Sequence, residues 1–357
     1  MFKFLDLEPE YFGLDISDLS LKIAYLKKKG KFFNLNSWGE TEIKSGIIQD
    51  GEIKNEDALI KEIKKALEKI KGKKLNIKNV IASLPEKKSF LEVIKMPKMD
   101  LEELKTAVFF EAENYIPLPI EKVYLDYQVV PSEDKDILKI LIAAVPKTIV
   151  DSYFSCLRKA GLTIRALEIE SQSIARALMG KEYASKSVII VDFGKSVTSL
   201  IICHGGFINF TSSVNISSGY LTKIVADSLG IESKEAESLK IKYGLNKSTD
   251  KDAKKINDLI ESSLVILKDQ IRKYINYYQG HNKNGKIDEI LLCGRGSNLS
   301  GLAEFLFYEL KIPTKIANPW INILPKSLKE VPGLPYKESL GYTTALGLAL
   351  KGLKEYD

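Results

Sequence analysis

The chain has 357 residues, a formal net charge of +6, 45% hydrophobic residues and a mean hydropathy of −0.09. This length allows two domains with hydrophobic cores of their own, and the composition is typical of globular proteins without an apolar run long enough to cross a membrane. The N-terminus, MFKFLDLEPE, lacks the apolar core of a signal peptide, so we expect a cytoplasmic protein.

The scarcity of cysteine and histidine argues against several kinds of site. The three cysteines are widely separated and odd in number, which disfavours both a disulfide framework and a zinc site. Only His204 and His281 are available, so a histidine-based metal or catalytic centre is not expected. Lysines are dispersed among glutamates, which predicts a solvated surface and no nucleic-acid interface.

The first predicted element is a β-hairpin over residues 11–26, YFGLDISDLSLKIAYL. Two apolar strands flank a turn with Asp15, Ser17, Asp18 and Ser20, and Lys22 follows. A carboxylate at a strand end can hold hydrated magnesium, and hydroxyl groups can donate to phosphate oxygens. A single turn of this kind is more often only a connection, so a second copy is needed to support a phosphate site.

The segment after this hairpin reads as an ordinary α/β unit, and the pattern changes at residue 85. A helix is predicted over 55–70 behind the N-cap Asn55, and a buried strand over 77–84. A strand, a helix over 101–115, two strands and a helix over 147–160 then follow. This order forms a small α+β unit that can bury its own apolar face, so residues 86–163 are predicted to be an inserted subdomain.

A second hairpin, over residues 187–207, repeats the pattern of the first. Its turn carries Asp192, Gly194, Lys195, Ser196 and Thr198 between two β-branched strands. Glycine lets backbone N–H groups approach an anion closely. Two such hairpins resemble the internal duplication of an actin-like nucleotide-binding fold, which implies that each half contributes one phosphate-binding turn.

Two later motifs extend this interpretation. Gly219 opens a helical region in which Glu237 and Lys240, three residues apart, share one helical face, although a surface ion pair explains that spacing equally well. After a long helix over 259–278 and a strand over 287–293, the turn Gly294, Arg295, Gly296 and Ser297 precedes a helix expected to begin near Leu299. A Gly-rich turn between strand and helix lets a nucleotide lie close to the backbone.

These motifs resemble the PilM family of actin-like proteins in type IV pilus assembly. MPKMDLEEL, FFEAENYIPLP and LDYQVV are similar to the inserted region of that family, and LTIRALEIESQSIARAL and IDEILLCGRGSNLSGL to later segments. The resemblance covers nearly the whole chain and implies an α/β, actin-like (ribonuclease H-like, duplicated) fold with an inserted small α+β subdomain. The regions implied are 1–85 (first half), 86–163 (insertion), 164–186 (connecting helix), 187–335 (second half) and 336–357 (C-terminal helix returning to the first half).

The resemblance further implies Mg·ATP in a central cleft. Asp15 and Asp192 would hold hydrated Mg²⁺, and Glu170 falls where relatives orient an attacking water, although a packing role for it stays open. The nucleotide-binding residues implied are Ser17, Asp18, Ser20, Lys22, Gly194, Lys195, Ser196, Thr198, Gly219, Glu237, Lys240, Gly294, Arg295, Gly296 and Ser297.

Several of these residues carry open alternatives. Ser17 stands where relatives usually have glycine, and Arg295 replaces a middle glycine, where its guanidinium could stack on adenine or point to solvent. Lys22 and Lys195 could neutralise phosphate charge or be solvated turn lysines. ATP hydrolysis is expected to be slow at most.

The partner implied by the resemblance is the short cytoplasmic N-terminal tail of PilN, an inner-membrane protein. The expected function is a cytoplasmic ATP-binding adaptor, recruited through its partners to the inner face of the membrane, with self-association left open. The tail would dock between the inserted subdomain and the first half. A cluster of Phe109, Phe110, Tyr115 and Ile116 is a candidate wall, although these residues could equally be core.

Three other classes compete. An FtsA-like filament-forming division protein would need a membrane-binding amphipathic helix, which is not apparent after residue 353. A sugar or acetate kinase would need a substrate pocket with a catalytic carboxylate. A heat-shock chaperone of the same superfamily would need a substrate-binding domain, for which no chain is left.

Overall fold

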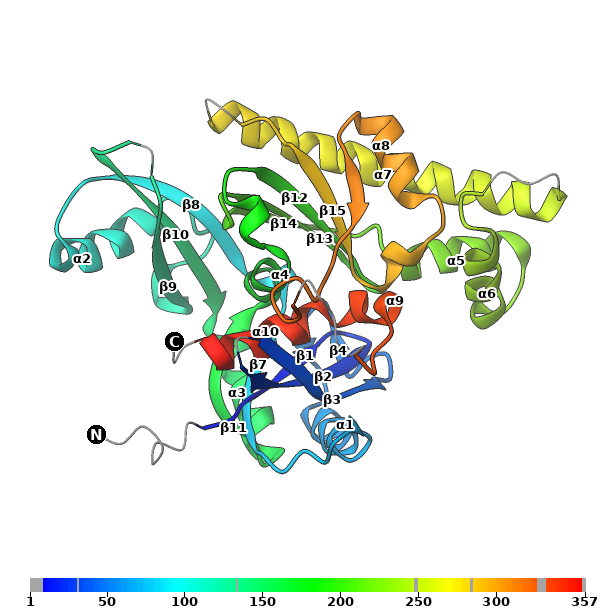
Figure 1. Ribbon diagram of the computed structural model, residues 1–357, viewed down its shortest axis with the longest axis horizontal. Coiled ribbons are helices and arrows are strands. Elements are labelled where there is room, and N and C mark those ends of the chain that lie inside the picture. Colours follow the sequence, from blue (N-terminus) through cyan, green and yellow to red (C-terminus); the bar gives the residue numbers. More distant parts are fainter. Residues whose placement is uncertain are drawn as a thin grey trace.

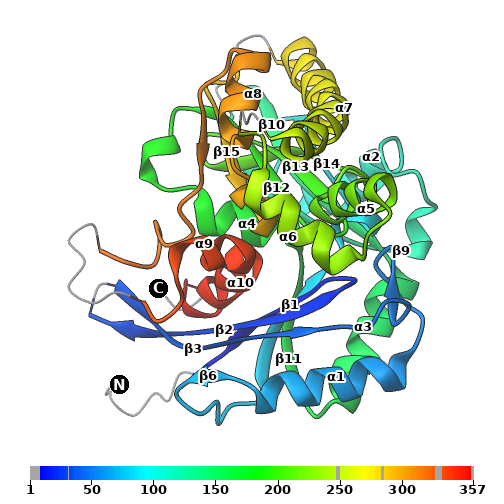
Figure 2. The ribbon, with the colours of Figure 1, turned by 90° about the vertical axis from the view of Figure 1, so that its right-hand side faces the viewer.

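The computed structural model describes residues 9–30, 32–132, 134–246, 250–282, 285–325 and 332–354. Two mixed sheets, of six and eight strands, form two halves with helices α4 and α10 packed between them (Figures 1 and 2). This arrangement places the ends of both predicted hairpins at the boundary between the halves.

The first half is a six-stranded sheet in the order β11, β7, β1, β2, β3, β6. The antiparallel pair β1 and β2 confirms the first predicted hairpin, and the helix predicted behind Asn55 is also confirmed because the Asn55 side chain accepts a hydrogen bond from the Ala58 N–H. The elements of this half are β1 (Phe12–Ile16), β2 (Ser20–Lys29), β3 (Phe32–Glu42), β4 (Ile48–Gln49), β5 (Glu52–Ile53), α1 (Glu56–Glu68), β6 (Lys71–Gly72), β7 (Asn79–Leu84) and β11 (Thr163–Ile169).

The inserted region contributes three strands to the edge of the eight-stranded sheet, with one helix on each face of them. Its elements are β8 (Phe90–Pro97), α2 (Leu101–Ala112), β9 (Val123–Val130), β10 (Ile137–Pro146) and α3 (Lys147–Lys159). Helix α2 buries Leu104 and Val108 against one face of the sheet, with Ile140 and Ile142 of β10. Helix α3 lies on the other face and shares the core of the first half, where its Tyr153 and Leu157 are fully buried.

The helix expected over residues 164–186 is wrong in its first part. Thr163–Ile169 forms strand β11, which pairs in parallel with β7, and the helix α4 covers only Glu170–Leu178. A strand is favoured because β7 offers an unpaired edge, and pairing satisfies the backbone groups of both segments. Glu170 is consequently the first residue of α4.

The second half continues the inserted sheet in the order β16, β15, β12, β13, β14, β8, β10, β9. The antiparallel pair β12 and β13 confirms the second predicted hairpin. The helix expected near Leu299 begins later, at Leu302, because the Gly-rich segment forms a 3₁₀ turn over Arg295–Asn298. The elements are β12 (Ser187–Phe193), β13 (Thr198–His204), β14 (Phe207–Val214), α5 (Ser218–Leu229), α6 (Ser233–Tyr243), α7 (Lys251–His281), β15 (Glu289–Cys293), α8 (Leu302–Leu310) and β16 (Thr314–Ile316).

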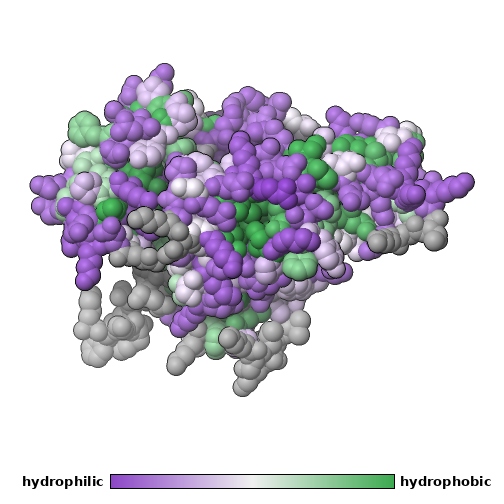
Figure 3. Space-filling view, turned by 90° about the horizontal axis from the view of Figure 1, so that it is seen from above, coloured by the Kyte–Doolittle hydropathy of each residue, from purple (hydrophilic) through white to green (hydrophobic). Residues whose placement is uncertain are grey.

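The surface is mainly hydrophilic on the face shown in Figure 3, where hydrophobic side chains gather near the middle. Helix α7 is the longest helix of the described chain, yet it carries charged residues throughout its length. Within the described ranges, every helix is too short or too polar to cross a bilayer.

Helices α4 and α10 (Thr343–Lys354) pack closely because small residues lie where they meet. A Cβ atom added at Gly347 of α10 would collide with the Ser173 carbonyl of α4, and one added at Gly13 of β1 would collide with the Ala345 carbonyl of α10. The short helix α9 (Tyr336–Ser339) and a 3₁₀ turn at Leu340–Tyr342 lead into α10. The C-terminal segment therefore joins the first half directly to α4.

Candidate functional site

The carboxylate of Asp15 lies at the end of β1 and is nearly fully buried. In the register of β1 and β2 it stands opposite Lys22, whose Nζ is 3.6 Å from its Oδ2. Ser83 at the end of β7 donates a 3.4 Å hydrogen bond to Asp15 Oδ1, while its Oγ accepts one from the Ile16 N–H at 2.8 Å. Ser83 thus fixes the end of β1, a role that sequence patterns did not reveal.

Ser17 and Ser20 close the turn of the first hairpin on each other. The Ser17 hydroxyl donates to the Ser20 carbonyl at 3.0 Å, and the Ser17 N–H donates to the same carbonyl. Lys22 Nζ donates to Ser20 Oγ at 3.0 Å. Ser17, which stands where relatives usually have glycine, therefore shapes the turn itself, and Lys22 connects this turn to Asp15.

Asp18 points to a neighbouring turn. Its two carboxylate oxygens accept hydrogen bonds from the backbone N–H groups of Asp50 and Gly51, each at 3.0 Å. Asp50 has a positive φ of 52°, which is unusual for a residue other than glycine. In this geometry Asp18 stabilises the turn between β4 and β5, and it is not brought together with Asp15.

The second hairpin is braced by the start of helix α5. The Ser218 N–H donates to the Gly194 carbonyl at 2.9 Å, and the Gly219 N–H donates to the Lys195 carbonyl at 3.0 Å. A side chain at Gly219 would collide with that Lys195 carbonyl, which explains the glycine. Helix α5 thus begins directly beside the turn, where its N-terminus favours an anion.

The hydroxyl residues of the second hairpin differ in how accessible they are. Thr198 is fully buried, and its hydroxyl donates to the Ile216 carbonyl at 2.5 Å. Ser196 is exposed in the turn. The Thr198 hydroxyl is therefore already used inside the protein, whereas the exposed Ser196 hydroxyl is better placed to donate a hydrogen bond to a phosphate.

The carboxylates of Asp15, Glu86, Glu170 and Asp192 lie near enough to one another, where the halves meet, to affect the pKa values of Glu170 and Asp192. Desolvation, together with the negative charge of Asp15, raises the pKa of Asp192 to about 6. Desolvation and the charges of Asp15, Glu86 and Asp192 raise the pKa of Glu170 well above its ordinary value. Burial also raises the pKa of Asp15, opposed by Lys22. The site therefore concentrates negative charge that a bound cation would compensate.

Glu86 is a buried member of this group that the sequence analysis missed. It follows β7 in a 3₁₀ turn, and its carboxylate accepts from the Ser171 N–H at 3.2 Å, at the N-terminus of α4. In return, the Glu86 N–H donates to Glu170 Oε2 at 3.3 Å. Burial raises the pKa of Glu86. The signal for Glu86 in the sequence was an acidic residue two positions after the predicted buried strand.

Lys240 is the centre of a polar network beside α5. Its Nζ is 2.6 Å from Glu237 Oε2, 2.8 Å from Thr222 Oγ1 and 2.8 Å from Ser218 Oγ. Its side chain is only 4% exposed, and desolvation lowers its pKa against the raising effect of Glu237. The network ties α6 to the residues that brace the second hairpin, so Glu237 and Lys240 do lie next to that turn.

The Gly-rich turn after β15 passes directly over Asp192. Gly294 has a φ of 78°, and a Cβ atom there would collide with the Asp192 carboxylate. A Cβ at Gly296 would lie 2.5 Å from the Phe193 carbonyl oxygen. The Ser297 hydroxyl donates to the Cys293 carbonyl and is buried, so it stabilises the turn. Both glycines are required for this close approach.

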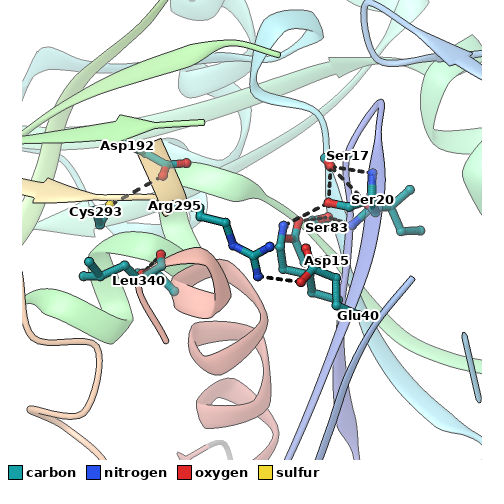
Figure 4. Close-up of polar contacts among 12 residues, drawn as sticks. Asp15, Ser17, Ser20, Glu40, Ser83, Asp192, Cys293, Arg295 and Leu340 are labelled. Atoms are coloured by element: carbon teal, nitrogen blue, oxygen red, sulfur yellow. Dashed lines mark hydrogen bonds and ion pairs between the residues drawn. The ribbon is translucent and has the colours of Figure 1, made fainter. Parts of the chain in front are cut away.

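Arg295 extends from this turn across to the first half. Its Nη2 lies 2.5 Å from Glu40 Oε2 on β3, as Figure 4 shows. The same view places Asp15 near Glu40 and Asp192 on the opposite side, beside Cys293. The Arg295 side chain is 53% exposed and its guanidinium is paired with Glu40 in this geometry.

The arrangement suits a hydrated divalent cation with a nucleotide. Among the described residues, no three histidine, cysteine or acidic side chains are arranged to ligate a metal directly. Magnesium commonly keeps several waters and needs only one or two carboxylates. Asp15 and Asp192 supply such carboxylates from the two halves, with a glycine turn and a helix N-terminus beside them.

Comparison with known proteins gives the family. The family model described as type IV pilus assembly protein PilM matches residues 13–353. The chain belongs to the PilM family. A solved PilM-PilN type IV pilus biogenesis complex has a chain that is 27% identical to this one, with a TM-score of 0.81, covering 97% of this chain and 99% of that one.

More distant relatives support an actin-like fold. MreB5 of Spiroplasma citri bound to ADP is 12% identical, covers 98% of this PilM-family chain and 96% of that chain, and has a TM-score of 0.58, which shows the shared fold alone. The cell division protein FtsA of Enterococcus hirae is 29% identical over 104 residues, or 29% of this chain. The matched region spans only 24% of that FtsA.

Proposed function

We propose that this PilM-family protein is a cytoplasmic, ATP-binding adaptor that binds the N-terminal tail of PilN at the inner face of the membrane. The observation that carries the proposal is its similarity, over nearly its whole length, to the chain of the PilM-PilN complex. The facing hairpins around Asp15 and Asp192 support the nucleotide part of the proposal.

ATP would lie between the two halves. Ser20, Lys22, Lys195 and Ser196 are the side chains of the two turns that would meet its phosphates, and Gly294 and Gly296 let the later turn pack closely on Asp192 and Phe193. Asp15 and Asp192 would hold magnesium through water, and the ion would neutralise phosphate charge. This support is geometric: carboxylates with raised pKa values gather where a cation is expected.

In this proposal Glu170, held by Glu86, would orient water near the phosphates. Desolvation and the charges of Asp15, Glu86 and Asp192 raise the pKa of Glu170, which makes its carboxylate a stronger base. Its hydrogen bond from the Glu86 N–H fixes its direction. Slow hydrolysis agrees with an adaptor, because a partner would recognise the ATP-bound state.

The candidate docking wall on α2 needs correction. Phe109, Phe110 and Tyr115 are exposed but Ile116 is buried, and α2 packs on the sheet face opposite α3 and the first half. The Tyr115 hydroxyl is also close enough to Tyr277 of α7 to influence its pKa, which places this end of the cluster toward the second half. These aromatics therefore do not line the boundary between the insertion and the first half.

The surface where β9 meets α3 fits the tail better. We name it the β9/α3 surface; it contains the half-exposed rings of Tyr124 and Phe154. Tyr124 donates to Asp151 Oδ1 at 3.1 Å, and Lys147 lies over its ring, so strand and helix are joined here. β9 is the outermost strand of the described sheet, and an extended peptide can add to such an edge.

Calorimetry tests this proposal in two titrations. The purified protein is titrated with Mg·ATP and then, with ATP bound, with a synthetic PilN tail. One-to-one saturable binding is expected in both titrations. ATP binding without tail binding would overturn the adaptor function, and tail binding without ATP binding would overturn the nucleotide site. The double variant Asp15→Ala/Asp192→Ala is expected to lose Mg-dependent ATP affinity.

The FtsA relatives favour one alternative function, an ATP-dependent filament. Sedimentation of the protein with and without Mg·ATP distinguishes it, since polymers would pellet only with nucleotide. A small-molecule kinase is less well supported, because the buried Glu86 and Glu170 carboxylates already accept hydrogen bonds from backbone N–H groups.

A further inference from the structure

Charged side chains of alternating sign form a row across the first-half sheet. Asp15 stands opposite Lys22 in the pair β1 and β2, and Lys22 stands opposite Glu40 in the pair β2 and β3. Directly opposed residues on neighbouring strands point to the same face. Glu40 therefore faces the same side as Asp15, toward the second half.

Arg295 completes this row from the other half of the molecule. Its guanidinium is 2.5 Å from Glu40, and its turn is fixed to the C-terminal segment because the Gly294 N–H donates to the Leu340 carbonyl at 3.0 Å. Asn298 Nδ2 also donates to the Lys337 carbonyl, at 2.9 Å. The turn that presents Arg295 is therefore held in place by backbone contacts (Figure 4).

A second ion pair at the same boundary provides a contrast. Lys195 of the second hairpin is 3.7 Å from Glu42, also on β3, but these side chains are 64% and 84% exposed. The Arg295 and Glu40 side chains are 53% and 23% exposed, less than those of the outer pair. Solvent screens exposed pairs strongly, so the inner pair of Arg295 and Glu40 is the stronger connection.

We propose that Glu40 is a positioning residue of the nucleotide site, and that with Arg295 it clamps the two halves so that Asp15 faces Asp192. This inference rests on the proposed ATP site. A site already arranged before ligand arrives loses less conformational freedom on binding and binds more tightly. The arginine that replaces a glycine in the Gly-rich turn thereby gains a defined role, which acts through Glu40 and not through adenine.

A double-mutant cycle tests the clamp. Mg·ATP affinity is measured by calorimetry for wild type, Glu40→Gln, Arg295→Gln and the double variant, with Glu42→Gln as the matched control on the same strand. Glu40→Gln is expected to weaken binding about three- to fivefold, the effect of a partly exposed ion pair. The double variant should be no weaker than Arg295→Gln alone, and Glu42→Gln should match wild type.

Additive losses in the double variant, or wild-type affinity for Glu40→Gln, would overturn the clamp. Failure of the wild type to bind ATP would instead overturn the nucleotide site, so a measurement without ligand is included.

Spin labels attached at Lys61→Cys on α1 and Lys234→Cys on α6 report the distance between the halves. Labelling is specific to these two positions because the three native cysteines are buried. Glu40→Gln should broaden this distance distribution and Glu42→Gln should not; identical distributions for both would refute the clamp.

Discussion

Asp192 shows at the residue scale what it costs to bury a carboxylate beside another one. Its carboxyl is desolvated beside Asp15, which raises its pKa from 3.8 to about 6. The folded protein therefore binds this proton more tightly than the unfolded chain does, so ionisation of Asp192 lowers stability as the pH rises from about 4 to about 6. Above about pH 6 the full free-energy cost of the ionised Asp192 carboxylate remains until a cation compensates its charge.

Asp192→Asn is therefore expected to stabilise the ligand-free protein. At pH 7.5 the gain should be about 2 kcal/mol, below the roughly 3 kcal/mol of the full pKa shift because solvent reaches this half-buried side chain. Thermal unfolding should show a midpoint about 3 °C above wild type at pH 7.5 and a difference roughly halved at pH 5. If Asp192→Asn is less stable than wild type at pH 7.5, the buried charge of Asp192 does not destabilise the protein. Mg·ATP affinity should fall whatever the effect on stability.

At the scale of elements, the contact between α4 and α10 decides how the halves are joined. Gly347 leaves no space between its Cα and the Ser173 carbonyl of the facing helix. Arg176 of α4 adds a hydrogen bond to the Gly347 carbonyl at 3.2 Å and pairs with the buried Glu168 of β11. The C-terminal helix is thus held against both the first-half sheet and α4.

Gly347→Ala should separate these two helices. Alanine is preferred in a helix by about 1 kcal/mol, but forcing apart a packed contact costs about 1–3 kcal/mol or more, so net destabilisation of about 2 kcal/mol is expected. Gly280→Ala is the matched control, because Gly280 lies in α7 with no atom within 4 Å of an added Cβ. Thermal unfolding should show a lower midpoint for Gly347→Ala and an unchanged or higher one for Gly280→Ala; equal midpoints would contradict the packing argument.

At the scale of the whole molecule, three phenylalanines of nearly equal exposure lie on three different surfaces. Phe154 on α3 is 43% exposed, Phe109 on α2 is 44% exposed and Phe307 on α8 is 44% exposed. Their similar exposure removes burial as a variable when each is changed to alanine. A comparison of the three alanine variants therefore distinguishes binding at the β9/α3 surface from binding at the α2 cluster or at a remote part of the second half.

Phe154→Ala is expected to weaken binding of the PilN tail about tenfold, as loss of an aromatic contact in an interface does. Phe109→Ala and Phe307→Ala should bind the tail as wild type does in the same calorimetric titration. A loss confined to Phe109→Ala would return the docking site to α2, and a loss confined to Phe307→Ala would move it to the second half.

Sequence patterns were informative where chemistry is local. The two Asp-bearing hairpins and the Asn55 cap appear in the structure as the pattern predicts, because strand alternation and capping depend on neighbouring residues. Even here tertiary context prevailed once: Thr163–Ile169 became a strand because β7 offered an edge. The roles assigned to individual nucleotide-binding residues stay predictions.

The sequence by itself determined the two hairpins and most of the order of elements, because each depends on residues a few positions apart. Only the tertiary structure decided which side chains meet. Ser83 and Glu86 reach Asp15 and Glu170 through parallel pairing and the position of α4, and Arg295 meets Glu40 across 255 residues. Such contacts depend on how sheets and helices pack in three dimensions, and no local periodicity encodes that packing.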